Sequence, residues 1–211
     1  MGVLEMHSPD KETLIWGVAT RALPGETECG DCHVVEQTTK GWLLAVADGL
    51  GHGSEAAFAS TIFQDVLIRY KNETPEKLIK LSHDALKNTR GIACTIMTID
   101  SQQNLLSWVA VGNVEGIVRH SNPAASCIEY VTMRGGIVGY RLPELQTSYL
   151  RLTEGDTLAL ATDGIDGDFV GNVSFVHPPD VLADRILDYY AKPADDALIL
   201  IARWQAQHDM E

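Results

Sequence analysis

Residues 41–54 read GWLLAVADGLGHGS, and this stretch decides the fold. Its first eight residues are apolar almost throughout, which is typical of a strand that is buried on both faces. The strand ends abruptly at Asp48, where a glycine-rich loop, DGLGHG, begins. From Ser54 to Tyr70 the apolar residues recur at three- and four-residue steps, which predicts an amphipathic helix. The sequence therefore predicts a buried strand that leads through an acidic, glycine-rich turn directly into a helix.

Strand patterns predominate on both sides of this unit. The residues before Gly41 predict a hairpin that turns near Lys40, and Gly, Asn, Pro and Asp separate short strands in the second half. This order predicts an α+β fold with mainly antiparallel sheets rather than alternating strand and helix. Further strands are expected at 13–20, 33–38, 92–100, 104–112, 114–120, 127–133, 146–152, 156–162 and 197–204, and further helices at 74–88 and 179–191.

Composition limits the function classes. The chain has 211 residues, and neither a repeat nor a linker-like segment divides it, so we expect a single domain over residues 1–211. It carries 16 Lys and Arg against 29 Asp and Glu, which gives a net charge of −13. Nucleic acid and anionic membranes are poor partners for such a chain, because they require clustered basic residues. No long apolar run is present and the first residues are too polar for a signal peptide, so we expect a cytoplasmic protein.

Acidic residues stand at the ends of four predicted strands: Asp31, Asp48, Asp163 and the pair Asp195-Asp196. An aspartate at a strand end is often only a turn residue that accepts hydrogen bonds from the nearby backbone. If these strands are neighbours, however, the carboxylates gather on one rim, where their repulsion calls for cations. Oxygen ligands select Mg²⁺ or Mn²⁺, and Gly49 has no Cβ to keep its carbonyl away from an ion. The pattern indicates hydrolysis of a phosphoester by metal-activated water.

Three further features each allow two interpretations. Cys29 and Cys32 form a C-x-x-C pair, but the flanking sequence predicts a turn that enters a strand, and a zinc site would need a second ligand pair. We therefore favour two small residues that flank Asp31. His52 is either a general acid that protonates the leaving serine oxygen or a loop residue, and we favour the loop. Asn113 is either a turn residue or a polar group near the site, and we favour the turn.

Five segments together resemble the PPM (type 2C) metal-dependent serine/threonine protein phosphatases, in their bacterial sporulation and stress-response branch. The segments are ECGDCHVVE, AVADGLGHGSEAAFAS, GIACTIMTID, LALATDGIDG and DDALILIARW, and they extend in the family's order across nearly the whole chain. The D-G-x-G-H-G segment followed by a helix of small residues is the most specific of them. The short chain without a sensor domain, together with VGNV at 111–114, is most similar to the type that resets the stressosome.

The resemblance implies an α-β-β-α sandwich of two antiparallel sheets with a two-metal site on one rim. It implies that Asp48 bridges two Mn²⁺ or Mg²⁺ ions and that the Gly49 carbonyl contacts one of them. Asp163 and Asp195 would bind the other ion, and Asp31 would hold metal-bound water or act as a direct ligand. The implied substrate is phosphoserine or phosphothreonine on a folded regulatory protein, which for the stressosome type means its phosphorylated scaffold proteins.

The sequence departs from the family pattern at two places. The usual G-G-D is Cys29-Gly30-Asp31 here, which puts a thiol near the site, and the usual D-D-M-T is Asp195-Asp196-Ala197-Leu198, which loses a hydroxyl. Two alternatives also stay open. One is a catalytically weak metal-binding interaction module of the same fold, which the loss of an aspartate would favour, although none is lost. The other is a phosphohydrolase for small molecules, although no P-loop pattern is present. We expect a monomer.

Overall fold

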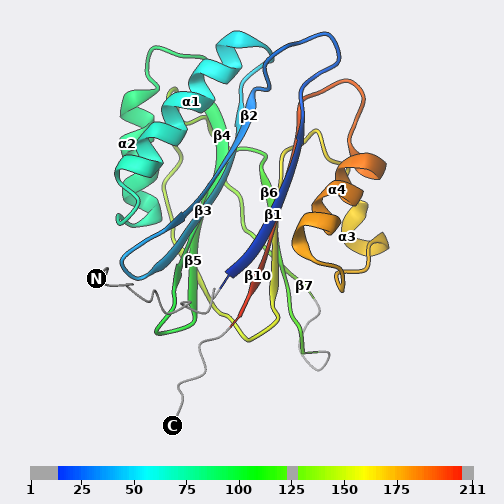
Figure 1. Cartoon of the computed structure of the whole chain (residues 1–211). Coiled ribbons are helices and arrows are strands. Elements are labelled where there is room, and N and C mark those ends of the chain that lie inside the picture. The colour runs from blue at the N-terminus through cyan, green and yellow to red at the C-terminus, as the bar shows by residue number, and fades with distance from the viewer. Residues whose placement is uncertain (1–13, 123–127, 206–211) are drawn as a thin grey trace, which may run out of the picture.

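The computed structural model describes residues 14–122 and 128–205 of the chain. Its elements form two sheets with helices outside them (Figure 1). The strands are β1 (Leu14–Arg21), β2 (Asp31–Gln37), β3 (Gly41–Gly49), β4 (Ile92–Asp100), β5 (Leu105–Val111), β6 (Glu115–Arg119), β7 (Ile128–Tyr130), β8 (Ser148–Arg151), β9 (Thr157–Ala161) and β10 (Ala197–Trp204). The helices are α1 (Ser54–Arg69), α2 (Pro75–Ala85), α3 (Phe169–Asn172) and α4 (Pro179–Tyr190).

Each sheet has five antiparallel strands. One has the order β1-β10-β9-β6-β7 and the other the order β2-β3-β4-β5-β8. Helices α1 and α2 lie against the second sheet, and α3 and α4 lie on the far side of the first (Figure 1). The four layers confirm the expected α-β-β-α sandwich. Within the described ranges, no helix combines the length and apolar character that crossing a bilayer would require.

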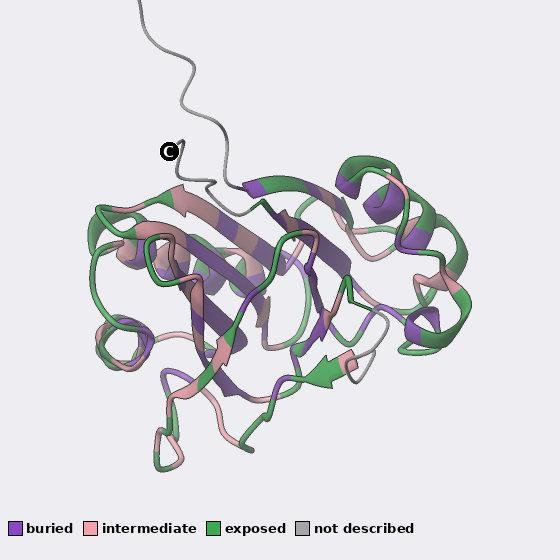
Figure 2. Ribbon diagram, turned by 90° about the horizontal axis from the view of Figure 1, so that it is seen from below, coloured by how far each residue is buried: buried purple, intermediate pink, exposed green. Residues whose placement is uncertain are grey.

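Strand β3 is buried on both faces, as its apolar sequence predicts. Leu44 and Val46 pack between the two sheets, in a cluster that also contains Trp204. Leu43 and Ala45 point the other way and pack under α1 and α2. Side chains alternate along a strand, so one continuous apolar run supplies two layers of the sandwich. Figure 2 shows the same pattern, with buried residues concentrated along the strands and exposed residues on the outer helices.

The glycine-rich loop after β3 brings α1 close to the end of that strand. Gly51 and Gly53 have φ values of 90° and 72°, a region that favours glycine. Gly53 is the N-cap residue of α1. A Cβ on Gly49 would lie 2.5 Å from the carbonyl oxygen of Ala56, which is too close for any side chain. The loop therefore holds the acidic strand end tightly against the first turn of the helix.

Candidate functional site

The predicted aspartates converge on one rim of the sandwich. Asp31 begins β2 and pairs with Asp48 of β3 across the sheet. Asp163 follows β9 and Asp195 precedes β10, and these two strands are antiparallel neighbours in the other sheet. The side-chain nitrogen of Asn113 donates to Asp48 at 3.4 Å and to Asp163 at 2.6 Å, so the ends of the two sheets meet here. Strand register thus brings together carboxylates that are far apart in sequence.

A hollow of about 400 Å³ opens at this rim. Three of the predicted carboxylates, Asp48, Asp163 and Asp195, line it together with Asn113 and the loop residues that precede α1. Asp31 is not among the residues that line the hollow, and only 8% of its surface is exposed. A substrate phosphate in the hollow would face the three lining carboxylates and would need their charge to be neutralised.

Burial and mutual repulsion disfavour the charged forms of these carboxyl groups. Burial, together with the charge of Asp48, raises the pKa of Asp31 to about 8, although a hydrogen bond from Thr162 acts in the opposite direction. Burial also raises the pKa of Asp48 to about 7, and repulsion by Asp163 adds to this. The pKa of Asp195 is raised by desolvation first and then by Asp163. The cluster is therefore electrostatically unfavourable at neutral pH unless cations are added.

The donor chemistry of the rim fits a hard divalent cation, since its ligands would all be oxygen atoms. Within residues 14–122 and 128–205, however, no three His, Cys, Asp or Glu side chains are arranged so that they could already hold an ion. The amide of Asn113 lies between Asp48 and Asp163 and donates to both. A donor in that position relieves the repulsion between two carboxylates. A cation at the same place would also offset this repulsion.

The adjacent residues Asp195 and Asp196 have different environments. Asp196 is 3% exposed, and its carboxylate accepts hydrogen bonds from the backbone nitrogen of Leu23 at 2.7 Å and of Gly30 at 2.9 Å. These bonds tie the start of β10 to the loop that enters β2. Asp195 is half-buried and lines the hollow. Of the two aspartates in the D-D pattern, Asp195 thus lines the hollow and Asp196 stabilises the fold.

Replacing Asp196 with asparagine is expected to lower the free energy of unfolding by about 1.5–3 kcal/mol, because the negative charge that strengthens the hydrogen bonds from the backbone of Leu23 and Gly30 is removed. Asparagine keeps the shape but directs an NH₂ group at one of the two donors. Urea unfolding at neutral pH measures the change. Asp195→Asn is the matched control, since among the described residues that side chain accepts from the backbone nitrogen of its neighbour Asp196 alone. Equal losses in the two variants would contradict the structural role of Asp196.

Sequence reasoning missed Thr162, whose hydroxyl donates to Asp31 at 2.7 Å and accepts from the backbone nitrogen of Leu198 at 2.9 Å. Its position directly before Asp163, in the segment Thr162-Asp163-Gly164, is the feature of the sequence that could have indicated a place near the carboxylates. Asn113, for which we favour a turn, directs its side chain at two of the carboxylates, as the alternative of a polar group near the candidate site describes. These two residues link the sheets at the rim.

The histidine and the cysteines near the rim are held by local contacts. His52 lines the hollow, and its Nδ1 lies 2.6 Å from a carboxylate oxygen of Glu26. The loop role that we favour and the general-acid alternative both stay untested. Cys32 is buried and its Sγ donates to the carbonyl of Ser60. Burial raises the pKa of Cys29 to about 11, so its thiol stays protonated. These positions agree with the favoured interpretation of Cys29 and Cys32 as two small residues that flank Asp31. Cys127 lies outside the described residues.

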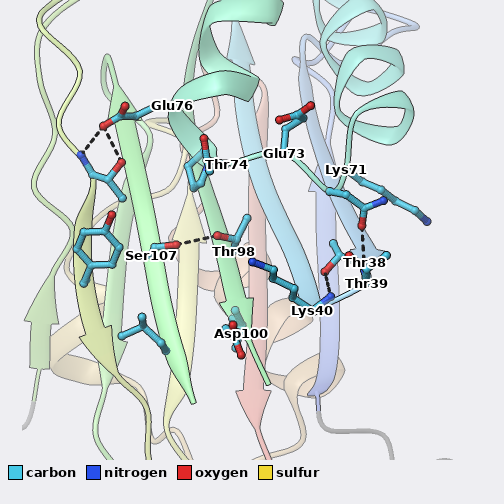
Figure 3. A pocket seen from close by; sticks show the side chains of 16 residues that line it. Thr38, Thr39, Lys40, Lys71, Glu73, Thr74, Glu76, Thr98, Asp100 and Ser107 are labelled. Carbon is cyan, nitrogen blue, oxygen red and sulfur yellow. Dashed lines mark hydrogen bonds between the residues drawn. The ribbon is translucent and has the colours of Figure 1, made fainter. Parts of the chain in front are cut away.

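A separate polar groove of about 310 Å³ lies at the opposite end of β3, beside the 38–41 turn (Figure 3). Glu76 on one wall accepts hydrogen bonds from the backbone and hydroxyl of Thr147, and Thr98 and Ser107 contact each other on the sheet. The length of β3 separates this groove from Asp48. Its carboxylates therefore do not contribute to the rim cluster.

Comparison with known proteins identifies the family. The family described as Stage II sporulation protein E (SpoIIE) matches residues 38–205. Phosphoserine phosphatase RsbX of Bacillus subtilis (strain 168) is 31% identical over 142 residues, which cover 67% of this chain and 70% of RsbX. A chain solved under the description "The bacterial stressosome: a modular system that has been adapted to control secondary messenger signaling" is 30% identical. It superposes with a TM-score of 0.83 and covers 91% of this chain and 100% of its own length.

A crystal structure of RsbX in complex with magnesium has the same fold. Its TM-score is 0.83 at 24% sequence identity, and the match covers 93% of this chain and 98% of RsbX. The fold, the matched family and the similarity to RsbX agree with one another and with the order of the five quoted segments. The chain therefore belongs to the SpoIIE family of PPM (type 2C) phosphatase domains.

Proposed function

We propose that this chain is a protein-serine/threonine phosphatase that hydrolyses phosphoserine or phosphothreonine on a bacterial regulatory protein. The convergence of aspartates from both sheets on one hollow is the observation that carries this function. Membership of the SpoIIE family and the similarity to a phosphoserine phosphatase support it. The residues that we propose as catalytic and as metal ligands are Asp31, Asp48, Asp163 and Asp195, with the carbonyl of Gly49 as a further metal ligand.

Two Mg²⁺ or Mn²⁺ ions, when bound, would lower the pKa of the attacking water and neutralise the phosphoryl oxygens. We propose that Asp48 and the Gly49 carbonyl hold one ion and that Asp163 and Asp195 complete the site for the other. Thr162 orients the Asp31 carboxylate through its hydrogen bond. The tight packing of Gly49 against Ala56 fixes the position of the carbonyl that would face the ion.

A stressosome scaffold protein is the substrate that the similarity favours. RsbX and the chain whose structure was described in work on the bacterial stressosome are both about 30% identical to this chain. We propose that the enzyme acts in the cytoplasm as a monomer, on a phosphorylated protein rather than on nucleic acid or membrane. The net charge of −13 disfavours the last two partners. A catalytically weak interaction module is not favoured, because all four aspartates lie at the same rim.

Phosphate release from a phosphoserine peptide and from an aryl phosphate tests this function. We expect turnover of both substrates in Mn²⁺ or Mg²⁺ and its loss in excess EDTA, with recovery when the metal is restored. A metal titration at fixed substrate concentration measures the dependence. Tight metal binding without turnover of either substrate would instead support the interaction module.

A further inference from the structure

A further pocket, of about 350 Å³, opens at the opposite end of β9 from the carboxylates. Thr157, the first residue of β9, is part of its lining, whereas Asp163 follows the end of that strand. Six residues of extended chain span about 20 Å, and no residue lines both this pocket and the carboxylate hollow. We call it the arginine pocket after Arg119, which lines it together with His120, Ser121, Ser174 and Phe175.

Strand register places an arginine on each side of Thr157. Arg119 of β6 and Arg203 of β10 both pair with Thr157 across the sheet. Directly opposed residues of antiparallel strands project on the same face, with Cβ atoms about 5 Å apart. On this face the same strands pack apolar residues against α3 and α4. The two arginine side chains therefore extend side by side next to the loop that joins these helices.

Contacts with uncharged groups fix the directions of both arginine side chains. Nε of Arg203 donates to the hydroxyl of Thr157 at 3.2 Å. One Nη of Arg203 donates to the carbonyls of Phe175 at 2.6 Å and His177 at 2.8 Å. The guanidinium carbon of Arg119 lies 5.1 Å from the centroid of the Phe175 ring. Among residues 14–122 and 128–205, the other Nη of Arg203 and the guanidinium nitrogens of Arg119 have no hydrogen-bond partner.

Neither arginine has an acidic partner in the described part of the chain. The ion pairs there involve other residues, and none of the residues that line the pocket is acidic. Asp156 is fully buried, and its carboxylate contacts His120 at 3.2 Å and accepts from Ser121 and Thr153. Burial lowers the pKa of Arg203, because desolvation disfavours its charged form. In a chain with 29 acidic residues, this local excess of positive charge favours an anion from outside the chain.

We propose that the arginine pocket binds a phosphate group. A guanidinium group presents N–H donors in a planar fork that matches the oxygens of phosphate. The hydroxyl of Ser174 lines the same pocket and can donate a further hydrogen bond. A water molecule occupies about 30 Å³, so a pocket of about 350 Å³ has room for the phosphate and part of the molecule that carries it. The proposal does not depend on the phosphatase function, because the pocket and the carboxylate rim share no residue.

Titration of the metal-free protein with inorganic phosphate tests the proposal. EDTA and constant ionic strength prevent phosphate from binding through a metal at the rim, and backbone amide NMR shifts report the binding. We expect saturable shifts at Ser121, Thr157 and Ser174, although the charge of −13 repels anions from the surface as a whole. Arg119→Gln should weaken binding about tenfold, because a charge-assisted hydrogen bond to phosphate is lost.

A second titrant distinguishes two sources of the phosphate group. Inorganic phosphate represents the free ion, and N-acetyl-phosphoserine amide represents a phosphorylated side chain of a protein. Tighter binding of the phosphoserine compound supports a docking site for a phosphoprotein, and tighter binding of inorganic phosphate supports a site for the free ion. Both ligands should lose affinity in Arg119→Gln.

Arg69→Gln is the matched control, because the Arg69 guanidinium also lies over an aromatic ring, 5.6 Å from the centroid of Tyr70, and outside the pocket. This variant should bind phosphate as tightly as wild type. If thermal unfolding shows that Arg119→Gln is not folded, Ser174→Ala replaces it, with an expected loss of about threefold. Shifts that do not saturate, or wild-type affinity in the folded pocket variant, would overturn the proposal. Because binding is measured without turnover, such a result leaves the phosphatase function untouched.

Discussion

Asp48→Asn is expected to lower phosphate release by about a thousandfold or more with both the phosphoserine peptide and the aryl phosphate. Asp48 lies where the ends of the two sheets meet. It pairs with Asp31 across one sheet, accepts a hydrogen bond from the Asn113 side chain and is repelled by the charge of Asp163. Asparagine keeps the size of the side chain but removes the charge that would bind a cation. The loss should therefore appear with any substrate, and initial rates at saturating Mn²⁺ measure it.

Asp184→Asn is the control for the change in charge. Asp184 is exposed on α4, which packs on the other sheet, away from the hollow. Its replacement should leave both rates unchanged, and thermal unfolding should show that both variants are folded. If Asp48→Asn kept more than about a tenth of the wild-type rate, Asp48 would not be a ligand on which turnover depends.

Divalent metal is expected to raise the melting temperature by about 5–10 °C at a concentration 100 times the dissociation constant, near pH 8. A shift of this size follows from metal binding to the folded state alone. Burial and mutual repulsion, which a cation would offset, raise the pKa of two carboxyl groups to about 8 for Asp31 and about 7 for Asp48, against an ordinary value of 3.8. The metal-free folded protein binds protons more tightly at these groups than the unfolded chain does. The contribution of these two groups to stability is therefore fully present below their unfolded pKa and is lost as the pH rises through about 7 and 8.

Thermal unfolding in EDTA and in Mn²⁺, at about pH 6 and about pH 8.5, measures both effects. The metal-free protein should be less stable at the higher pH, and the stabilisation by Mn²⁺ should be larger there because protons compete less. Asp48→Asn removes one repelled carboxylate, so this variant should be more stable than wild type in EDTA and gain less from Mn²⁺. A metal-free protein that is more stable at the higher pH would contradict the electrostatic description of the rim.

Much of the fold could be predicted because its local patterns are unambiguous. The apolar run 41–48 is buried on both faces, and the change of period at Ser54 marks the start of α1. The helix expected at 74–88 is present as α2, with Thr74 as its N-cap and Pro75 as its first residue, which are typical start signals of a helix. In each case the spacing of apolar residues or the capping chemistry depends on neighbours within a few positions. Such signals are fully contained in the sequence.

The finer organisation of the site depends on contacts between distant segments. Asp195 and Asp196 are chemically identical neighbours, and only the backbone of the loop at Leu23 and Gly30 makes Asp196 a structural residue. Thr162 reaches Asp31 across the two sheets, which no local pattern encodes. The sequence predicts which carboxylates stand at strand ends. Strand order and register decide which side chains meet there and with what partners.

Anomalous diffraction at the manganese edge, from crystals soaked in Mn²⁺, tests most directly whether the carboxylate rim is a metal centre. We predict anomalous peaks beside Asp48, Asp163 and Asp195 in wild-type crystals, with oxygen ligands at about 2.0–2.6 Å. The peak beside Asp48 should disappear in Asp48→Asn. Manganese bound only at other surfaces, in crystals of enzyme that hydrolyses phosphoserine peptides, would contradict the proposed metal centre.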